Sequence, residues 1–178
     1  MILSEEIINY DCHKRAVGAV SVDIYKDSNF KVFKDMSSKK KGAEFERIVE
    51  EYAIRLGNTV APPESSEHDR KISGIESQWG IKKAEIKGSF LWGTGTHFRW
   101  QQIRPGQDYD VMVFLAIYPQ KINFYYATKD VVKAAVEIQD ERGYWIHNQH
   151  GGMKVNSGTF FIDGMPEDFP WMKKWIND

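Results

Sequence analysis

The sequence predicts a mixed α/β (α+β) fold in which a central mixed β-sheet is flanked by helices. An amphipathic segment over residues 37–57 has helical spacing. A nearly continuous apolar run over residues 111–118 is typical of a central strand buried on both faces, and residues 122–127 return beside it as a hairpin partner. With 178 residues, 42% of them hydrophobic, the chain has the size and composition of one domain spanning 1–178.

Charge and cysteine content exclude several classes of protein. The formal net charge of −1 excludes a uniformly basic nucleic-acid-binding surface, although a basic face balanced by an acidic one stays open. Cys12 is the only cysteine, which excludes an internal disulfide and a cysteine-based zinc site and fits a reducing compartment. The acidic start at Glu5 and Glu6 is unlike a signal peptide, and no apolar run is long enough to span a membrane. We therefore expect a cytoplasmic protein with no membrane partner.

The clearest predicted helix covers residues 37–57. Ser37 or Ser38 can cap its start, and Gly57 ends it. Its apolar residues recur on one face: Phe45, Ile48, Val49, Tyr52, Ala53 and Leu56. Glu46 lies at the edge of this face, where a carboxylate can reach across to a neighbouring sheet, although an ordinary boundary glutamate is the simpler interpretation.

A strand over residues 82–88 carries the most suggestive chemistry. Because side chains alternate along a strand, Ala84 and Ile86 would point into the core while Glu85 and Lys87 project together from the other face. A carboxylate holds a hard cation such as Mg²⁺, and an adjacent lysine can orient a water molecule or offset charge on a phosphate. Glu-x-Lys is also common on solvated strand faces, so its weight depends on its surroundings.

Asp69 gives this strand a second carboxylate if the preceding segment pairs with it. In a hairpin the residue numbers of paired positions have a constant sum, and Asp69 with Glu85 centres the turn near residues 77–78. Two like charges at such a position repel each other unless a cation lies between them. The register therefore predicts a metal site formed by Asp69 and Glu85. A turn at 73–74 or at Gly80 would instead keep the carboxylates apart.

Residues 88–97 form a glycine-rich stretch that is expected to be a flexible loop. It lacks the Gly-Lys-[Ser/Thr] ending of a phosphate-binding P-loop. Residues 98–103 are expected to be a short helix or turn, where Arg99, Arg104 and Lys87 can form a local basic patch.

The end of the chain is less informative. Residues 128–138 have helical spacing, and 168–176 are expected to form a short closing helix. Between them, two histidines flank Asn148 and Gln149, which are side chains able to read adenine edges. The histidines could also bind a metal, but no third ligand is evident, and a polar loop is the plainer interpretation.

The motifs resemble the PD-(D/E)XK nuclease superfamily when they are taken in order. The matching residues span about 40–127: Gly42 to Glu46 opening a helix, then Asp69, then Glu85-Ile86-Lys87, then Trp100-Gln101-Gln102 before a hydrophobic strand. The resemblance implies a restriction-endonuclease-like core at 40–127, with peripheral elaborations at 1–36 and 140–178 for DNA recognition or dimerisation. His68 stands where the family pattern has proline.

The resemblance also implies roles for individual side chains. Asp69 and Glu85 would bind Mg²⁺, for which Mn²⁺ can substitute, and Lys87 would be the catalytic lysine. Glu46 would support the metal site from the helix, and Gln101 or Gln102 would be a glutamine found in several branches. Six residues are candidate DNA contacts: Lys71, Arg99, Gln102, Arg104, Asn148 and Gln149.

The expected function is a Mg²⁺-dependent DNA endonuclease, most simply a small type II restriction-type enzyme acting as a homodimer. A structure-specific nuclease, such as a Holliday-junction resolvase or a repair nuclease, is the first alternative. A nucleic-acid-binding module without catalysis is the second, and the near-neutral net charge favours it mildly unless a narrow basic cleft faces an acidic exterior.

Overall fold

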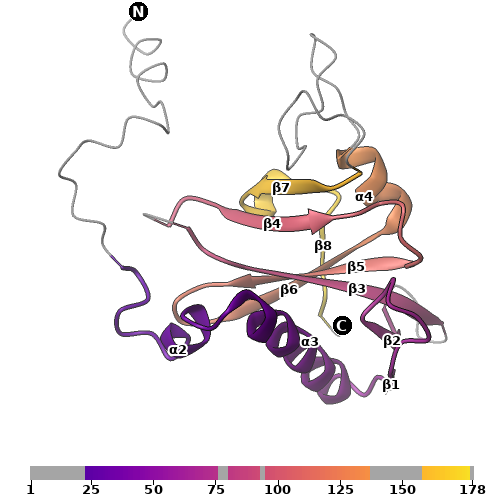
Figure 1. Cartoon of the computed structure of the whole chain (residues 1–178), viewed down its shortest axis with the longest axis horizontal. Coiled ribbons are helices and arrows are strands. Elements are labelled where there is room, and N and C mark those ends of the chain that lie inside the picture. Colours follow the sequence, from indigo (N-terminus) through magenta and orange to yellow (C-terminus); the bar gives the residue numbers. More distant parts are fainter. Residues whose placement is uncertain (1–22, 76–79, 93–94, 137–157, 177–178) are drawn as a thin grey trace, which may run out of the picture.

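A six-stranded mixed sheet forms the centre of the chain (Figure 1). The computed structural model describes residues 23–75, 80–92, 95–136 and 158–176. Within this part of the chain the strand order is β1-β2-β3-β5-β6-β8; β3 and β5 run parallel, and the other neighbours are antiparallel. The predicted α+β class is therefore confirmed. The strands are β1 (Val60–Ala61), β2 (Arg70–Ser73), β3 (Ile81–Phe90), β5 (Val111–Ile117), β6 (Ile122–Thr128) and β8 (Lys173–Lys174).

The two faces of this sheet carry different layers. Figure 1 shows a long helix on one face and a small second sheet on the other, so that the large sheet lies between them. The first layer contains α2 (Lys31–Lys34) and α3 (Ser38–Arg55). The second contains the paired strands β4 (Phe98–Ile103) and β7 (Phe160–Gly164), with α4 (Lys129–Val136) packed against β5, β6 and β7.

The core lies on both sides of β5, all of whose residues are buried. On the helical side, Tyr52 stacks on Phe124 with ring centroids 3.8 Å apart, and its hydroxyl donates to the Trp175 carbonyl at 2.6 Å. On the other side, Trp100 packs edge-on against Phe114 and donates from Nε1 to the Leu115 carbonyl at 3.0 Å. Both faces of the sheet are thus closed by aromatic side chains, and the polar atoms of Tyr52 and Trp100 have backbone partners.

Helix α3 follows the prediction closely. It begins after Ser37 and is followed by Gly57 in the left-handed region at φ 80°. Its N-terminal half presses directly on β3, because a Cβ built on Gly88 would lie 2.4 Å from the Phe45 ring. Only glycine permits this approach, which brings the first turns of the helix, including Glu46, onto the strand that carries the Glu-x-Lys motif.

The predicted hairpin register is also confirmed. Arg70 pairs with Ala84 and Lys71 with Lys83, which is the register that sets Asp69 against Glu85. The Asp69 N–H donates to the Ala84 carbonyl at 2.9 Å, so the pairing extends to Asp69 itself. The alternative hairpins, which would have separated the carboxylates, are wrong.

Three local predictions are wrong. Residues 88–90 continue β3 instead of forming a loop, and 98–103 form strand β4 instead of a helix or turn. The buried side chains of Phe98, Trp100 and Ile103 explain β4, since they pack in the core while the strand pairs with β7. Residues 166–176 contain a 3₁₀ turn (Pro166–Asp168) and the edge strand β8, because Pro170 interrupts helical hydrogen bonding.

Membrane insertion through a helix has no candidate in the described ranges, where no helix combines the length and the apolar character needed to cross a bilayer.

Candidate active site

The candidate site lies where β2 and β3 part. Strand β2 pairs with β3 as far as Ala84, and β3 continues to Phe90 without a described partner on that edge. Asp69 stands at the point of separation, where its Oδ2 accepts a hydrogen bond from the Ile86 N–H at 2.7 Å. The Asp69 carboxylate thus accepts the hydrogen bond that the backbone of a further β2 residue would accept. This bond fixes its orientation beside the Glu-x-Lys motif.

Glu85 and Lys87 project side by side from the face of β3 that lies opposite α3, as expected. The Lys87 Nζ is 2.6 Å from Glu85 Oε1. Glu85 is only 6% exposed, and this burial raises the pKa of its carboxyl group, an effect that Lys87 counters and the charge of Asp69 reinforces. The Asp69 charge therefore disfavours the ionised form of Glu85, which is an effect that a bound cation relieves.

Glu46 reaches the same site from α3. Its Oε2 accepts a hydrogen bond from Arg70 Nη1 at 2.8 Å. Burial raises the pKa of Glu46 and the Asp69 charge raises it further, whereas Arg70 and Lys87 lower it. The structure thus brings together all four charged residues of the predicted set: Glu46, Asp69, Glu85 and Lys87.

Arg70 connects these parts, and the sequence reading missed it. Besides Glu46, its guanidinium bonds to the Asp69 carbonyl at 2.7 Å and to Glu50 at 3.3 Å. It therefore links α3 to the first residue of the hairpin. The sequence offers one signal for this role of Arg70, which is its position directly after Asp69. Neighbouring side chains on a strand point to opposite faces, so Arg70 is expected to face away from the Asp69 side chain.

The donor set suits Mg²⁺ or Mn²⁺. Both are hard cations that take oxygen ligands, and Mg²⁺ is commonly held by one or two carboxylates with water and substrate phosphate as its other ligands. Asp69 uses Oδ2 for the Ile86 N–H and Glu85 uses Oε1 for Lys87, which leaves a second oxygen on each carboxylate. Across the described ranges no group of three or more His, Cys, Asp or Glu residues is arranged to hold a metal, so the fit is to a two-carboxylate site.

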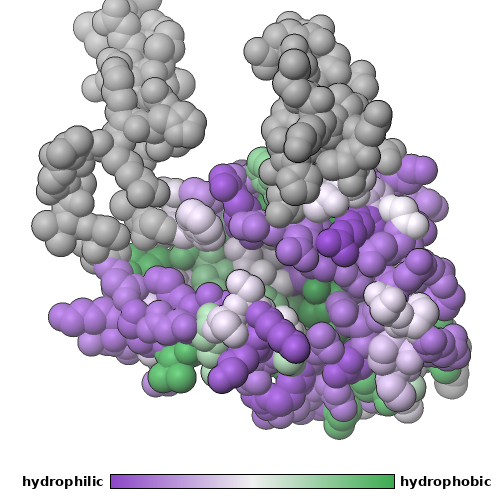
Figure 2. Space-filling model, in the orientation of Figure 1, coloured by the Kyte–Doolittle hydropathy of each residue, from purple (hydrophilic) through white to green (hydrophobic). Residues whose placement is uncertain are grey.

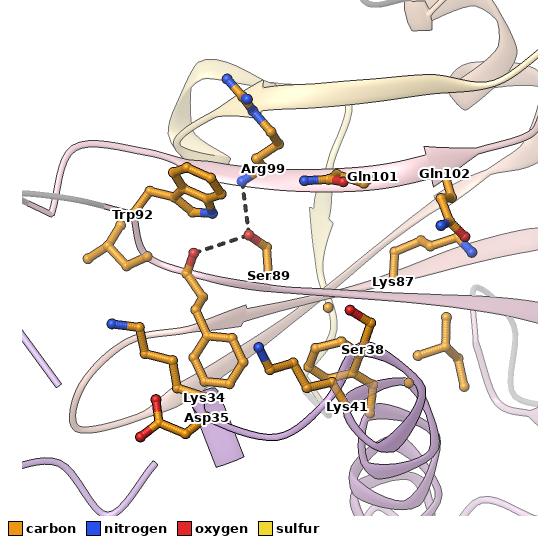
Figure 3. Close-up of a pocket in the computed structure, with 16 residues that line it drawn as sticks. Lys34, Asp35, Ser38, Lys41, Lys87, Ser89, Trp92, Arg99, Gln101 and Gln102 are labelled. Carbon is orange, nitrogen blue, oxygen red and sulfur yellow. Dashed lines mark hydrogen bonds between the residues drawn. The ribbon is translucent and has the colours of Figure 1, made fainter. Parts of the chain in front are cut away.

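A groove of about 620 Å³ extends from Lys87 along the open edge of β3 (Figure 3). The α2–α3 layer and β4 form its two walls, and Figure 2 shows apolar patches in the hollow between these mostly hydrophilic layers. Asp69 and Glu85 are not part of its lining but flank Lys87 at one end. Its polar and charged lining residues are Lys34, Asp35, Ser38, Lys41, Lys87, Ser89, Arg99, Gln101 and Gln102.

The two glutamines lie on the opposite wall from the helix. Figure 3 shows Gln101 and Gln102 on β4, with Gln102 beside Lys87. Gln102 sits in a bulge of the β4–β7 ladder and has φ 58°, the one positive value for a non-glycine residue in the described ranges. Such a conformation costs about 1–3 kcal/mol and is often retained at functional sites.

The candidate DNA contacts are divided by the structure. Arg99 and Gln102 line the groove, and the charge of Arg104 lowers the pKa of Glu85. Lys71 instead pairs with Glu64 at 2.7 Å, and neither residue lines the groove. Residues 148 and 149 lie outside the described ranges.

Two more residues near the site were not singled out from the sequence. Lys41 lines the groove from the first turns of α3, which the sequence shows only as a run of lysines. Tyr109 is 2% exposed and its hydroxyl has no hydrogen-bond partner in the described structure. Burial raises the pKa of Tyr109 and the charge of Glu85 adds to the shift, which places this hydroxyl within electrostatic reach of the acidic pair.

Comparisons with known proteins give little. No protein-family model matches the sequence, and the comparison with curated proteins gives no match. Among solved structures, a bacterial homing endonuclease matches over 56% of this chain and 74% of its own, with 19% identity and a TM-score of 0.43. A likeness of this size supports no argument about family or chemistry.

Proposed function

We propose that this chain is a Mg²⁺-dependent DNA endonuclease with a PD-(D/E)XK-type site. The observation that carries the proposal is the position of Asp69 at the parting of two strands, in register with Glu85, while Lys87 lies 2.6 Å from Glu85. A lysine-lined groove leads away from this point. Two carboxylates, one ammonium and an anion-attracting groove are the parts that metal-assisted phosphodiester hydrolysis requires.

Each residue has a separate task in this proposal. Asp69 and Glu85 would hold a Mg²⁺ ion, which would supply Lewis-acid stabilisation of negative charge on the phosphate and a lowered pKa for a bound water. Lys87 orients the attacking water and offsets charge on the phosphate, and its pairing with Glu85 keeps the ammonium in place. Glu46, through Arg70, keeps α3 and the Asp69 backbone together.

A matched pair of lysine variants tests the proposal. Lys87→Ala is expected to lower the rate of plasmid cleavage in Mg²⁺ by about 10²–10³-fold, as for other groups that stabilise transition-state charge. Lys83→Ala is the control, because Lys83 lies on the same strand and pairs with Asp108 at 2.7 Å, outside the site. EDTA should abolish cleavage by the wild type. Equal loss in both variants, or no metal-dependent cleavage of any DNA by the wild type, would reject the proposal.

The same protein preparation shows which kind of DNA is the substrate. Discrete fragments from plasmid identify a restriction-type enzyme, cleavage confined to a four-way junction identifies a resolvase, and tight binding without cleavage identifies a binding module. Cleaving both strands of a duplex needs two sites, so a restriction-type enzyme is expected to be a homodimer. Light scattering of the protein with and without DNA measures this directly.

A further inference from the structure

Trp92 is a large aromatic side chain that is exposed and is not part of the packed core. It is 43% exposed and is the one exposed aromatic residue in the described ranges. It lies at the opposite end of the groove from Lys87, two residues past the end of β3, where its N–H donates to the His97 carbonyl at 2.8 Å. An exposed indole at the end of a cation-lined groove is a feature of binding surfaces and not of cores.

The indole is held firmly in place. The Arg99 guanidinium carbon lies 5.4 Å from the Trp92 ring centre and 5.1 Å from the Phe161 ring centre. Arg99 is fixed in turn by its ion pair with Asp163, and the His97 ring lies 6.2 Å from Trp92 at an angle of 27°. Figure 3 shows Trp92 and Arg99 together at this end of the groove. A platform ordered before binding loses little entropy when a ligand stacks on it.

The groove between the two ends suits a polyanion. Lys34, Lys41 and Arg99 line it beyond Lys87, where Asp35 is the one carboxylate among the described lining residues; Lys34 also pairs with Asp23 at 3.0 Å and Arg99 with Asp163, both outside the lining. Lys41 lies over the Phe90 ring at 5.7 Å and has no carboxylate partner in the described structure. Trp92 lies five residue steps beyond Lys87, which is about 16 Å at about 3.3 Å per extended residue, or at most about five base steps of a stacked DNA strand.

We propose that Trp92 is a base-stacking subsite, and that the groove binds DNA containing an unpaired base within about five nucleotides of the cleaved phosphate. Naming the Lys87 end as the cleavage point rests on the proposed function. Stacking on an aromatic face is open to any base, whereas a base inside a duplex must first be unpaired and unstacked. The inference therefore favours a structure-specific substrate over an intact restriction site.

Binding measured in EDTA tests this inference separately from cleavage. The probes are a labelled duplex with a single-stranded flap that carries 2-aminopurine, the same duplex without the flap, and an RNA version of the flap. Wild type should bind the flapped DNA more tightly than the intact duplex and quench the 2-aminopurine. Trp92→Leu should weaken flap binding about 5- to 150-fold and abolish quenching, while Trp92→Phe retains most of both.

Two controls separate stacking from general effects. Ile54→Ala removes an exposed apolar side chain on α3 outside the groove and should change nothing. Lys41→Gln should weaken binding of all the DNA probes, whereas Lys121→Gln should not, although Lys121 also lies over an aromatic ring, that of Tyr118. Circular dichroism confirms that each variant is folded.

Three outcomes overturn the inference. The first is equal affinity for flapped and intact duplex, and the second is flap binding unchanged in Trp92→Leu. The third is tighter binding of the RNA flap, which would reject a DNA base as the occupant of the Trp92 subsite. Any of these can occur while the wild type still cleaves DNA in Mg²⁺, so the proposed nuclease activity survives a failure of the subsite. Conversely, Trp92-dependent flap binding without cleavage would support the subsite and reject the nuclease.

Discussion

Gly88→Ala tests whether the contact between α3 and β3 is as tight as the structure shows. An alanine Cβ at this position would lie 2.4 Å from the Cδ1 and Cε1 atoms of Phe45. Phe33 lies edge-on to the Phe45 ring at 5.3 Å and Phe90 lies 6.3 Å away on the same side of β3, so the ring can turn aside only toward the groove that it lines. Something in this aromatic cluster must therefore move.

The expected cost follows from overpacking in a well-packed core, which is about 1–3 kcal/mol. At this chain length each kcal/mol lowers the melting temperature by about 2–4 °C. Urea denaturation gives the free energy of unfolding, and a thermal scan gives the melting temperature. Gly42→Ala is the control on the same helix: no atom lies within 4 Å of its added Cβ, so alanine should stabilise the protein by about 0.5–1 kcal/mol.

A double variant decides whether Phe45 is responsible. If the added methyl group presses on this ring, Gly88→Ala together with Phe45→Leu will be more stable than the two separate losses predict, with a coupling of about 0.5 kcal/mol or more. The reasoning is refuted if Gly88→Ala is as stable as the wild type, or if the two losses simply add.

Three other predictions follow from individual contacts. Mg²⁺ at about ten times its dissociation constant should stabilise the wild type by about 1.4 kcal/mol, or about 3–6 °C, and should not stabilise Asp69→Asn; an equal shift in both would place the ion elsewhere. Burial raises the pKa of Glu85, so the contribution of this group to the free energy of unfolding is fully present below about pH 4.5 and is lost as the pH rises through the raised pKa. Because the glutamine does not ionise, Glu85→Gln should become more stable relative to the wild type over this pH range in urea titrations. Tyr25→Phe should cost about 0.5–1.5 kcal/mol, because the hydroxyl's bond to the Ile117 carbonyl at 2.5 Å is lost, whereas the Leu91 N–H, which donates to the hydroxyl at 2.8 Å, keeps the Ile117 carbonyl at 3.0 Å; a neutral result would mean that water replaces the hydroxyl.

The site could be predicted from the sequence because its geometry is local. Strand alternation places Glu85 and Lys87 on one face, and a hairpin register fixed by its turn sets Asp69 against them. Helical periodicity likewise places Glu46 on the border of the buried face of α3, from which it reaches Arg70. The function of these residues stays a prediction until cleavage is measured.

Features that depend on distant pairing could not be predicted in this way. Strand β4 has a polar Gln101-Gln102 step in its sequence, and its partner β7 comes much later in the chain. The sequence places Gly88 at the start of a loop, because glycine usually weakens a strand and nothing in the sequence shows that Phe45 packs against it. Trp92 and Lys41 form one groove only after the sheet and α3 are assembled.

The open edge of β3 has a consequence for handling the protein. Beyond Ile86 its backbone groups face the groove without a described neighbouring strand, and such an edge is a template for pairing with a second chain. Lysine side chains beside an edge oppose that pairing by charge repulsion. Replacing Lys87 or Lys41 with a neutral residue is therefore expected to increase self-association as well as to weaken DNA contacts. Dilution series of these variants should show aggregation beginning at lower protein concentration than for the wild type.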